Sequence, residues 1–250
     1  MPAPFLREVL VDRPPDADAT VYPWNLPALD GIRQVTFTKP ISFFVGENGS
    51  GKSTLLTALA EASGFNPEGG GYSARFSNRE DAVAPLLSSH LKLRWLPRAR
   101  DGFFLRADSL YNLATYVDQL VREGGTYDSY GGRSLHEQSH GEALLALFTD
   151  RFVPRRPALF LLDEPETALS GPRQLALLRI LHDHEARGLS QFIIATHSPI
   201  LLGYPGALLL SFDRGPLAPI AYQDTDAYQI YRAFMTHRQE MLRELWRDDD

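Results

Sequence analysis

The sequence predicts an α/β fold built on a mostly parallel sheet, and two kinds of segment support this. Short apolar runs of strand-forming residues occur at 40–45, 158–163 and 191–196. Helical patterns follow at 55–63 and 172–187. Alternating strands and helices indicate βαβ units. Continuous apolar strands are typical of a sheet that is covered on both faces.

The remaining segments complete this outline. Residues 1–45 consist of extended pieces broken by proline-rich turns, which predicts N-terminal antiparallel strands. Residues 79–123 are expected to be mostly helical, and the best helical stretch ends at Gly124 and Gly125. A closing hairpin is expected within 207–223, followed by an amphipathic helix over 225–247.

The chain of 250 residues has a length that suits one domain with a built-in lobe. We expect residues 1–78 and 151–250 to form the α/β core. Residues 79–150 would then be an inserted helical lobe within the single domain 1–250.

Composition excludes several classes of protein. The formal net charge of −6 argues against a surface coated with basic charge for nucleic-acid binding. The absence of cysteine excludes disulfides and thiolate metal sites. The N-terminus lacks a signal-peptide pattern, and no apolar run approaches the length of a membrane span. We therefore expect a cytoplasmic protein without a transmembrane segment.

A glycine-rich loop, GENGSGKS at 46–53, lies between a predicted strand and a predicted helix. This spacing is typical of a loop whose backbone N–H groups surround phosphate oxygens. Lys52 would reach the β- and γ-phosphates, and Ser53 would bind Mg²⁺. The alternative is a glycine-rich turn without a ligand. The expected nucleotide contacts are Gly46, Glu47, Asn48, Gly49, Ser50, Gly51, Lys52, Ser53 and Thr54.

Two carboxylates follow the strand at 158–163. Ligands of parallel sheets bind at the carboxyl ends of the strands, where Ser53 also lies. Asp163 is therefore expected to hold Mg²⁺, and Glu164 to polarise the water that attacks the γ-phosphorus. The alternative is a pair of solvated acids at a strand end.

His197 comes directly after the next predicted strand, near the same edge of the sheet. A histidine there can hydrogen-bond a γ-phosphate. The alternative is a histidine that only satisfies backbone groups. His182 and His184 are expected on a solvated face of the helix 172–187.

The stretch SHGE at 139–142 predicts a helix start. Ser139 and Glu142 have the spacing of a capping box. Gly141 costs up to about 1 kcal/mol in a first helical turn, which suggests that something approaches the backbone closely. A serine-capped helix start of this kind offers a contact surface for an anion.

Together, GENGSGKS, SHGE, LFLLDEP and ATHS resemble, in order and spacing, the Walker A, signature, Walker B and switch-histidine motifs of ATP-binding-cassette (ABC) ATPases. The resemblance covers about residues 40–210. Within that superfamily, SHGE and DEPE look more like soluble heads of the SMC, RecF and RecN kind than transporter cassettes.

The resemblance implies a P-loop NTPase fold that uses ATP and Mg²⁺, with Lys52, Glu164 and His197 in catalytic roles. It also implies a head-to-tail homodimer on ATP binding, in which Ser139, Gly141 and the Glu142 N–H complete the partner's site. The closing and opening of this dimer would act on an effector protein or a nucleic acid, although the net charge does not support DNA binding. Two alternatives stay open: a transporter's nucleotide-binding subunit, and a nucleotide-gated module with little turnover.

The family pattern leaves two assignments at the nucleotide open. Transporter cassettes carry a glutamine before the helical lobe, but no glutamine occurs between Ser53 and Gln119. Arg106 or Asp108 are candidates to replace it. An aromatic face for adenine could come from Tyr22 or Trp24, which could equally be core residues.

Overall fold

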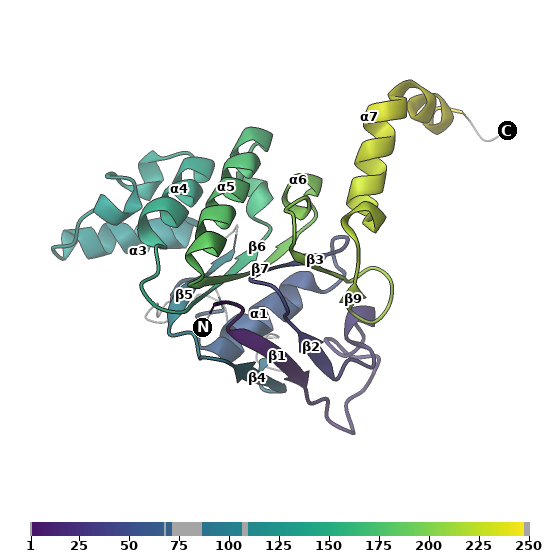
Figure 1. Ribbon diagram of the computed structural model, residues 1–250, viewed down its shortest axis with the longest axis horizontal. Helices are drawn as coiled ribbons and strands as arrows, with labels where there is room; N and C mark the ends of the chain where they lie inside the picture. The colour runs from purple at the N-terminus through teal and green to yellow at the C-terminus, as the bar shows by residue number, and fades with distance from the viewer. Residues whose placement is uncertain (1, 68, 72–86, 107–109, 248–250) are drawn as a thin grey trace.

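The computed structural model describes residues 2–67, 69–71, 87–106 and 110–247. A six-stranded sheet forms its centre (Figure 1). The strand order is β5-β6-β7-β3-β8-β9. The first five strands pair in parallel, whereas β9 is antiparallel to β8. The strands are β3 (Ile41–Val45), β5 (Asp101–Arg106), β6 (Ala158–Asp163), β7 (Ser190–Thr196), β8 (Leu208–Ser211) and β9 (Ala218–Pro219).

The two faces of this sheet are covered by different elements. On one face, α1 (Lys52–Ser63) packs its leucines against residues of β3, β6 and β7. On the other face lie α3 (Leu110–Arg122), α4 (His140–Ala146), α5 (Gly171–Arg187) and α6 (Pro199–Leu202). All residues of β3, β6 and β7 are buried, as expected for strands between two layers. The expected parallel α/β core is therefore confirmed.

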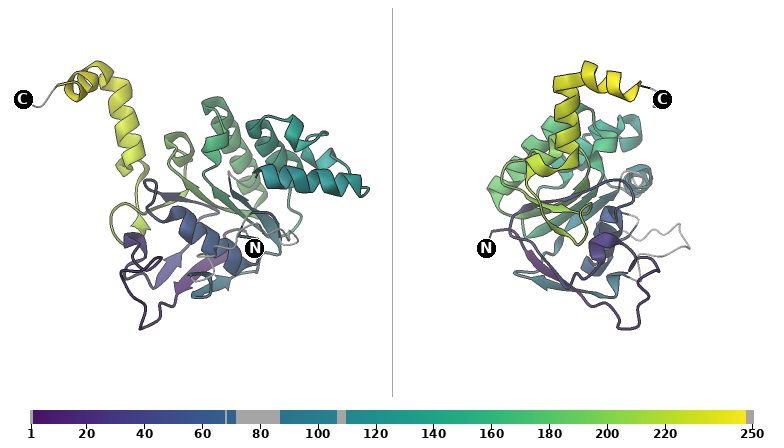
Figure 2. Two further views of the ribbon diagram at one scale, coloured as in Figure 1. Left: turned by 180° about the vertical axis from the view of Figure 1, so that it is seen from behind. Right: turned by 90° about the vertical axis from the view of Figure 1, so that its right-hand side faces the viewer.

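A second sheet of three antiparallel strands lies beyond α1 (Figure 2). Its order is β2-β1-β4, with β1 at Leu6–Val11, β2 at Gln34–Thr36 and β4 at Leu91–Trp95. The predicted N-terminal antiparallel strands are confirmed as β1 and β2. The third strand comes from a distant part of the chain.

The prediction that residues 79–123 are mostly helical is wrong for 91–106, where the chain forms β4 and β5. Residues 91–95 alternate in exposure, and apolar Phe103–Leu105 of the edge strand β5 are buried, with Phe104 in one core layer and its two neighbours in the other. β4 pairs with β1, and β5 pairs with β6. These partners supply the backbone hydrogen bonds that make both segments strands, and the local sequence does not indicate such partners.

Within the described residues after β5, the helical part of the predicted lobe begins with α3 at Leu110. Helix α3 ends before Gly124 and Gly125, as expected, whereas the predicted capping residues Asp108 and Ser109 lie outside the described residues. Helix α4 follows and continues as a π-helical turn through Arg151. The division of the chain into a core and an inserted lobe stays a prediction.

The C-terminal helix α7 (Asp226–Leu245) extends away from the two sheets (Figures 1 and 2). It buries none of its residues and is kinked at His237. Both the closing hairpin of β8 and β9 and this helix agree with the prediction. Within the described ranges, we find no helix that is both long and apolar enough to cross a membrane.

Candidate nucleotide site

The loop at 46–53 connects β3 to α1 and turns through glycines. Gly49 and Gly51 have φ of 83° and 104°, which only glycine adopts readily. Gly46 is needed for a different reason. A Cβ atom there would lie 2.7 Å from Asp213 Oδ1 and 2.9 Å from Ser50 Oγ. Asp213 also accepts a hydrogen bond of 2.7 Å from the Glu47 N–H, so its carboxylate fixes the start of the loop.

Lys52 begins α1 and is 3% exposed. Its Nζ donates hydrogen bonds of 2.6 and 2.7 Å to the carbonyl oxygens of Gly46 and Glu47, so the side chain folds back over the loop. Burial lowers the pKa of Lys52, and the carboxylates of Glu164 and Asp213 oppose that shift. A phosphate group would give this buried cation a negative partner.

Ser53 and Asp163 come together at the carboxyl end of the sheet. Ser53 Oγ donates a hydrogen bond of 2.8 Å to Asp163 Oδ1. Asp163 ends β6 and is 7% exposed. In the parallel pairing of β5 and β6, Arg106 lies opposite Asp163. Of the two candidates for the missing glutamine, Arg106 therefore lies beside the Ser53–Asp163 pair, and Asp108 is not described.

Glu164 has an unusual backbone conformation. Its φ and ψ are 48° and 53°, and no other non-glycine residue in the described ranges has a positive φ. Its N–H donates to the Ala195 carbonyl of β7 at 2.9 Å, which holds the turn in place. Non-glycine residues in this region carry a strain of about 1–3 kcal/mol, and such residues cluster at functional sites.

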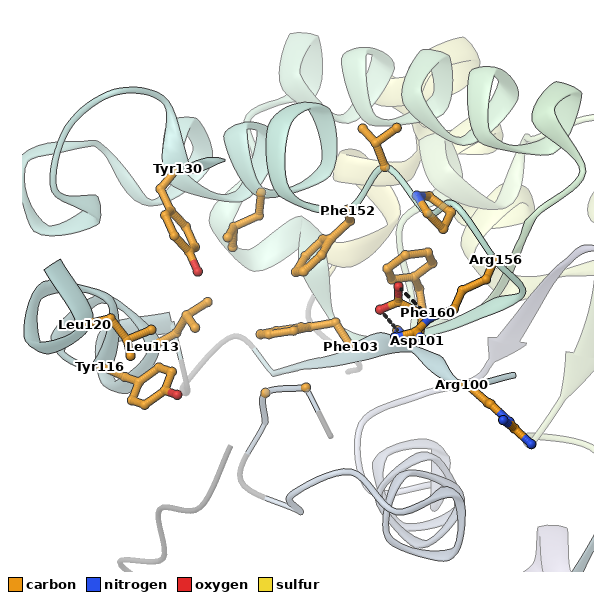
Figure 3. Close-up of a pocket in the computed structure, with 16 residues that line it drawn as sticks. Arg100, Asp101, Phe103, Leu113, Tyr116, Leu120, Tyr130, Phe152, Arg156 and Phe160 are labelled. Carbon is orange, nitrogen blue, oxygen red and sulfur yellow. Dashed lines mark hydrogen bonds and ion pairs between the residues drawn. The ribbon is translucent and has the colours of Figure 1, made fainter. Parts of the chain in front are cut away.

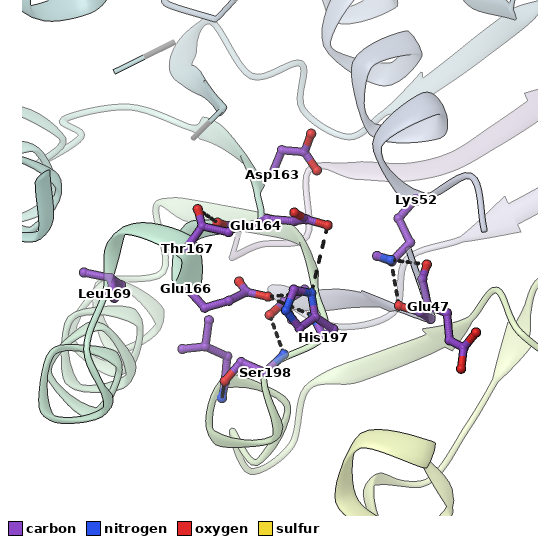
Figure 4. A network of polar contacts seen from close by, with 12 residues as sticks. Glu47, Lys52, Asp163, Glu164, Glu166, Thr167, Leu169, His197 and Ser198 are labelled. Atoms are coloured by element: carbon purple, nitrogen blue, oxygen red, sulfur yellow. Dashed lines mark hydrogen bonds and ion pairs between the residues drawn. The ribbon is translucent and has the colours of Figure 1, made fainter. Parts of the chain in front are cut away.

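His197 faces two carboxylates (Figure 4). Its Nδ1 lies 4.0 Å from Glu164 Oε1 and 3.4 Å from Glu166 Oε1. The His197 backbone N–H also donates to Glu166 Oε1 at 2.9 Å. The Glu166 side chain is only 6% exposed, so a buried carboxylate orients a half-exposed histidine. The structure therefore places His197 next to Glu164, where the sequence predicted it.

Sequence reasoning missed Asp213 and Glu166 as parts of this site. Asp213 follows β8, and β8 pairs directly with β3. The rule that pointed to Asp163 and His197, which looks for polar groups after parallel strands, also applies to Asp213. Glu166 gave no such signal, because its role depends on the turn at 165–168 that brings it back under His197.

The SHGE stretch forms the predicted capping box. Ser139 Oγ accepts from the Glu142 N–H at 3.4 Å, and Glu142 Oε2 accepts from the Ser139 N–H at 3.1 Å. The Glu142 N–H is thus engaged within its own helix. The polar contacts of Ser139 and Glu142 extend to Arg173 of α5 rather than to the phosphate loop.

Gly141 is buried, and its close neighbours belong to the same chain. A Cβ atom there would lie 2.8 Å from both the Ala168 carbonyl oxygen and Arg173 Nη1. The predicted close approach to this backbone therefore exists, but it is intramolecular. Ser139, in contrast, is exposed at the surface.

The two candidate aromatics differ clearly. Trp24 is 5% exposed and packs against His90 and the Arg13 guanidinium, so it is a core residue. Tyr22 is 40% exposed, and its hydroxyl hydrogen-bonds Thr54 Oγ1 beside the phosphate loop. Tyr22 is therefore the aromatic residue that stays a candidate for stacking on adenine.

The expectation that His184 lies on a solvated helix face is wrong. His184 is 2% exposed. Its ring nitrogens contact Ser190 Oγ at 2.8 Å and the Phe148 carbonyl oxygen at 3.3 Å. Burial lowers its pKa. The helix pattern did not reveal this contact because it depends on the packing of α5 against β7 and the turn after α4.

A separate cavity of about 340 Å³ lies between β5, α3 and the turn before β6 (Figure 3). Phe103, Phe152 and Phe160 line it, and Asp101 and Arg156 lie at its polar side. Its sheet residues come from the first halves of β5 and β6, whereas Arg106 and Asp163 end these strands. This cavity is thus distinct from the cluster around Lys52.

The residues of the cluster fit a magnesium nucleotide. Mg²⁺ takes oxygen ligands and often has only one or two from the protein, which matches a hydroxyl and a carboxylate 2.8 Å apart. Within the described residues, no group of three histidine or acidic side chains forms a closed metal cage. A loop of left-handed glycines and a buried lysine fits a polyphosphate.

The comparisons with known proteins agree with this geometry. Residues 85–203 match the family described as "AAA domain, putative AbiEii toxin, Type IV TA system", and residues 29–83 match one described as "AAA domain". The cytochrome c biogenesis ATP-binding export protein CcmA of Paramagnetospirillum magneticum is 30% identical over 188 residues. That match covers 70% of this chain and 82% of the relative.

Two solved structures have the same fold. The cbiO1 protein from Clostridium perfringens, part of the ABC transporter complex cbiONQ, superposes with a TM-score of 0.52 and 16% identity, over 96% of this chain and 99% of that one. The ATP-binding cassette MJ1267 in its ADP conformation gives a TM-score of 0.51 and 15% identity, over 97% and 99% of the two chains. The fold and the phosphate-loop site define a P-loop ATPase of the ABC type. The chain belongs to the AAA/ABC-type P-loop ATPase family.

Proposed function

We propose that this protein binds Mg-ATP in the cluster around Lys52 and hydrolyses it to ADP and phosphate. The observation that carries the proposal is the 2.8 Å contact between Ser53 and Asp163, with Lys52 and Glu164 at the same edge of the sheet. Bound Mg²⁺ would neutralise phosphate charge next to this pair.

Each residue of the cluster has a role that follows from its position. The Lys52 ammonium leaves the loop carbonyls and binds phosphate oxygens. The Glu164 carboxylate accepts a proton from the attacking water, which is typically worth about 10²–10⁴-fold in rate. His197, oriented by Glu166, donates a hydrogen bond to the γ-phosphate. Tyr22, whose hydroxyl hydrogen-bonds Thr54 beside the loop, would stack on adenine.

We further propose that ATP closes two copies of the chain head to tail, with Ser139 of one copy covering the nucleotide of the other. The exposed Ser139 hydroxyl at the start of α4 supports this arrangement. ATP favours the closed state because it contacts both copies only there. The closing motion would act on a cytoplasmic effector protein or a nucleic acid.

The transporter alternative fits the comparisons equally well, since CcmA is an ATP-binding export protein and cbiO1 is part of a transporter complex. In that case the effector is a membrane subunit. Purification of the tagged chain from its native host in mild detergent distinguishes the two. Stoichiometric recovery of a membrane protein favours the transporter subunit, and its absence favours a soluble effector.

Glu164→Gln provides the direct test of the proposed dimer. This variant should bind Mg-ATP without turnover and shift from monomer to dimer in size-exclusion chromatography with light scattering. Ser139→Arg, combined with Glu164→Gln, should block the shift. Dimers that form equally without ATP, or monomers under all conditions, would contradict the sandwich. Normal wild-type turnover with an unchanged rate in Glu164→Gln would contradict the catalytic assignment. Wild-type binding with almost no turnover would favour a nucleotide-gated module.

A further inference from the structure

Arg173, in the first turn of α5, reaches across to the first turn of α4. Its Nη1 donates a hydrogen bond of 3.0 Å to Ser139 Oγ, and its Nη2 donates one of 3.1 Å to Glu142 Oε1. The side chain is 35% exposed, so the guanidinium is held at the surface by two partners. No sequence motif assigned Arg173 a role.

Gly141 makes this contact possible. A Cβ atom at Gly141 would lie 2.8 Å from Arg173 Nη1 and 2.9 Å from Arg173 Cδ. Contacts this short do not occur for real side chains, so an alanine would displace the arginine or the helix start. The glycine of the signature stretch therefore leaves room for Arg173 next to Ser139.

The hydrogen bonds of Ser139 determine what its hydroxyl can still do. A serine hydroxyl has one hydrogen and two acceptor positions. Ser139 Oγ already accepts from the Glu142 N–H at 3.4 Å and from Arg173 Nη1 at 3.0 Å. With both acceptor positions filled, the hydroxyl can make a further hydrogen bond only by donating its own hydrogen. The oxygens of a phosphate only accept, so they require a donor of this kind.

We propose that Arg173 is a positioning residue that holds Ser139 as a hydrogen-bond donor toward the γ-phosphate bound by a second copy of the chain. This inference rests on the proposed ATP-sandwiched dimer. Glu142 keeps the guanidinium in place through its carboxylate, and Arg133 lies 3.6 Å from the same carboxylate on the other side. Arg173 acts through Ser139 and is not itself a catalytic residue.

Single variants give the first test. Arg173→Ala should lower ATP turnover about tenfold or more, because a charge-assisted hydrogen bond to Ser139 is lost. Arg173→Lys should retain an intermediate rate, since one ammonium cannot bridge Ser139 and Glu142 as a guanidinium does. The matched control is Arg179→Ala on the same helix. The Arg179 side chain is 77% exposed and, among the described residues, pairs with Asp183 at the surface, so turnover should stay within about twofold. Wild-type turnover in Arg173→Ala would overturn the proposal.

Mixed dimers test whether Arg173 acts on the partner's site. A dimer of one Arg173→Ala chain and one Lys52→Ala chain contains one intact composite site, with Lys52 from the first chain and Ser139 held by Arg173 from the second. The mixture should recover turnover well above either chain alone. Replacing the second chain with the double variant Lys52→Ala/Arg173→Ala should abolish the recovery. A fold defect in Arg173→Ala would not be rescued in this way.

A reference mixture separates failure of the inference from failure of the proposed function. Ser139→Ala mixed with Lys52→Ala tests the sandwich with Arg173 unchanged in both chains. Recovery in this reference, but none with Arg173→Ala, would overturn only the role of Arg173. No recovery in the reference, despite wild-type turnover, would overturn the sandwiched dimer and this inference together.

Discussion

Ser53 Oγ and Asp163 Oδ1 lie 2.8 Å apart although 110 positions separate them in the chain. Ser53 is in the first turn of α1, directly after the loop that follows β3. Asp163 ends β6, and β7 lies between β6 and β3 in the sheet. Because these strands are parallel, their carboxyl ends meet at one edge and bring the two oxygen atoms together.

This contact predicts a magnesium-dependent effect of ATP on stability. At about 100 times Kd, Mg-ATP should add about 2.7 kcal/mol to the unfolding free energy and raise Tm by roughly 5–10 °C. In Asp163→Asn, the shifts measured with ATP plus Mg²⁺ and with ATP plus EDTA should be equal. Lys52→Ala should show no shift in either condition. A wild-type shift that is unaffected by EDTA would refute the magnesium role of the Ser53–Asp163 pair.

The backbone of Glu164 predicts opposite effects of two substitutions. Glu164→Gln keeps the left-handed conformation with its strain, whereas Glu164→Gly adopts φ of 48° without it. We expect Glu164→Gly to be more stable than Glu164→Gln by about 1 kcal/mol in urea unfolding, although both lose turnover. Equal stabilities would mean that the conformation of Glu164 carries no strain.

The contact between Glu166 and His197 predicts non-additive kinetics. If Glu166 acts by orienting His197, then Glu166→Ala and His197→Ala should each lower kcat by a similar factor. The double variant should be no slower than the worse single variant, since both changes remove one interaction. Steady-state rates of the wild type, the two single variants and the double variant complete this double-mutant cycle. Multiplied losses in the double variant would assign Glu166 a separate role.

Sequence patterns predicted those parts of the fold whose signal is local. The apolar runs of β3 and β6 are bounded by glycine, proline or acidic residues, and helix α1 ends before Gly64 as its pattern indicates. β4 and β5 were missed because they are held mainly by distant partners. β4 pairs with β1, some 80 residues earlier in the chain, as the contact between Lys92 and Asp12 shows.

The candidate site divides in the same way. Lys52, Ser53, Asp163, Glu164 and His197 could be predicted, because each follows a recognisable strand or lies in a glycine-rich loop. The contacts of Arg173 with Ser139 and Glu142 could not, since they depend on how α5 packs against α4. The burial of His184 likewise depends on tertiary packing.

His184 predicts a loss of stability in mild acid. Burial lowers its pKa below the ordinary value of 6.5, so the folded state keeps this ring neutral where the unfolded state binds a proton. Stability from this group is therefore full above about pH 6.5 and falls as the pH decreases below that value toward the folded pKa. Urea unfolding at about pH 5.5 and about pH 7.5 measures the difference.

The control for this prediction is His184→Gln, which retains hydrogen-bonding groups but does not titrate. Its unfolding free energy should be lower than that of the wild type at about pH 7.5, because the amide cannot reproduce both ring contacts. Its unfolding free energy should, however, decrease less between about pH 7.5 and about pH 5.5 than that of the wild type. An equally steep loss in His184→Gln would assign the acid sensitivity to other groups.

Helix α7 predicts that the C-terminal end of the chain adds little to the stability of the core. It buries none of its residues, and Ile230, Met235 and Trp246 are 58%, 79% and 74% exposed. Its first turn is different, because the Tyr228 ring packs 4.7 Å from that of Tyr222. A chain that ends after Gln229 keeps this contact. Its Tm should differ from that of the full chain by about 2 °C or less, as expected when only exposed groups are removed.

Leu201→Ala in α6 provides the comparison, because Leu201 is fully buried and α6 contacts α7. This substitution should lower the unfolding free energy by about 2–5 kcal/mol and therefore lower Tm clearly. Calorimetry of the full chain, the shortened chain and Leu201→Ala measures all three under one condition. If the shortened chain melted as early as Leu201→Ala, α7 would have to pack against the core in solution, and its exposed apolar face would have a partner within the same chain.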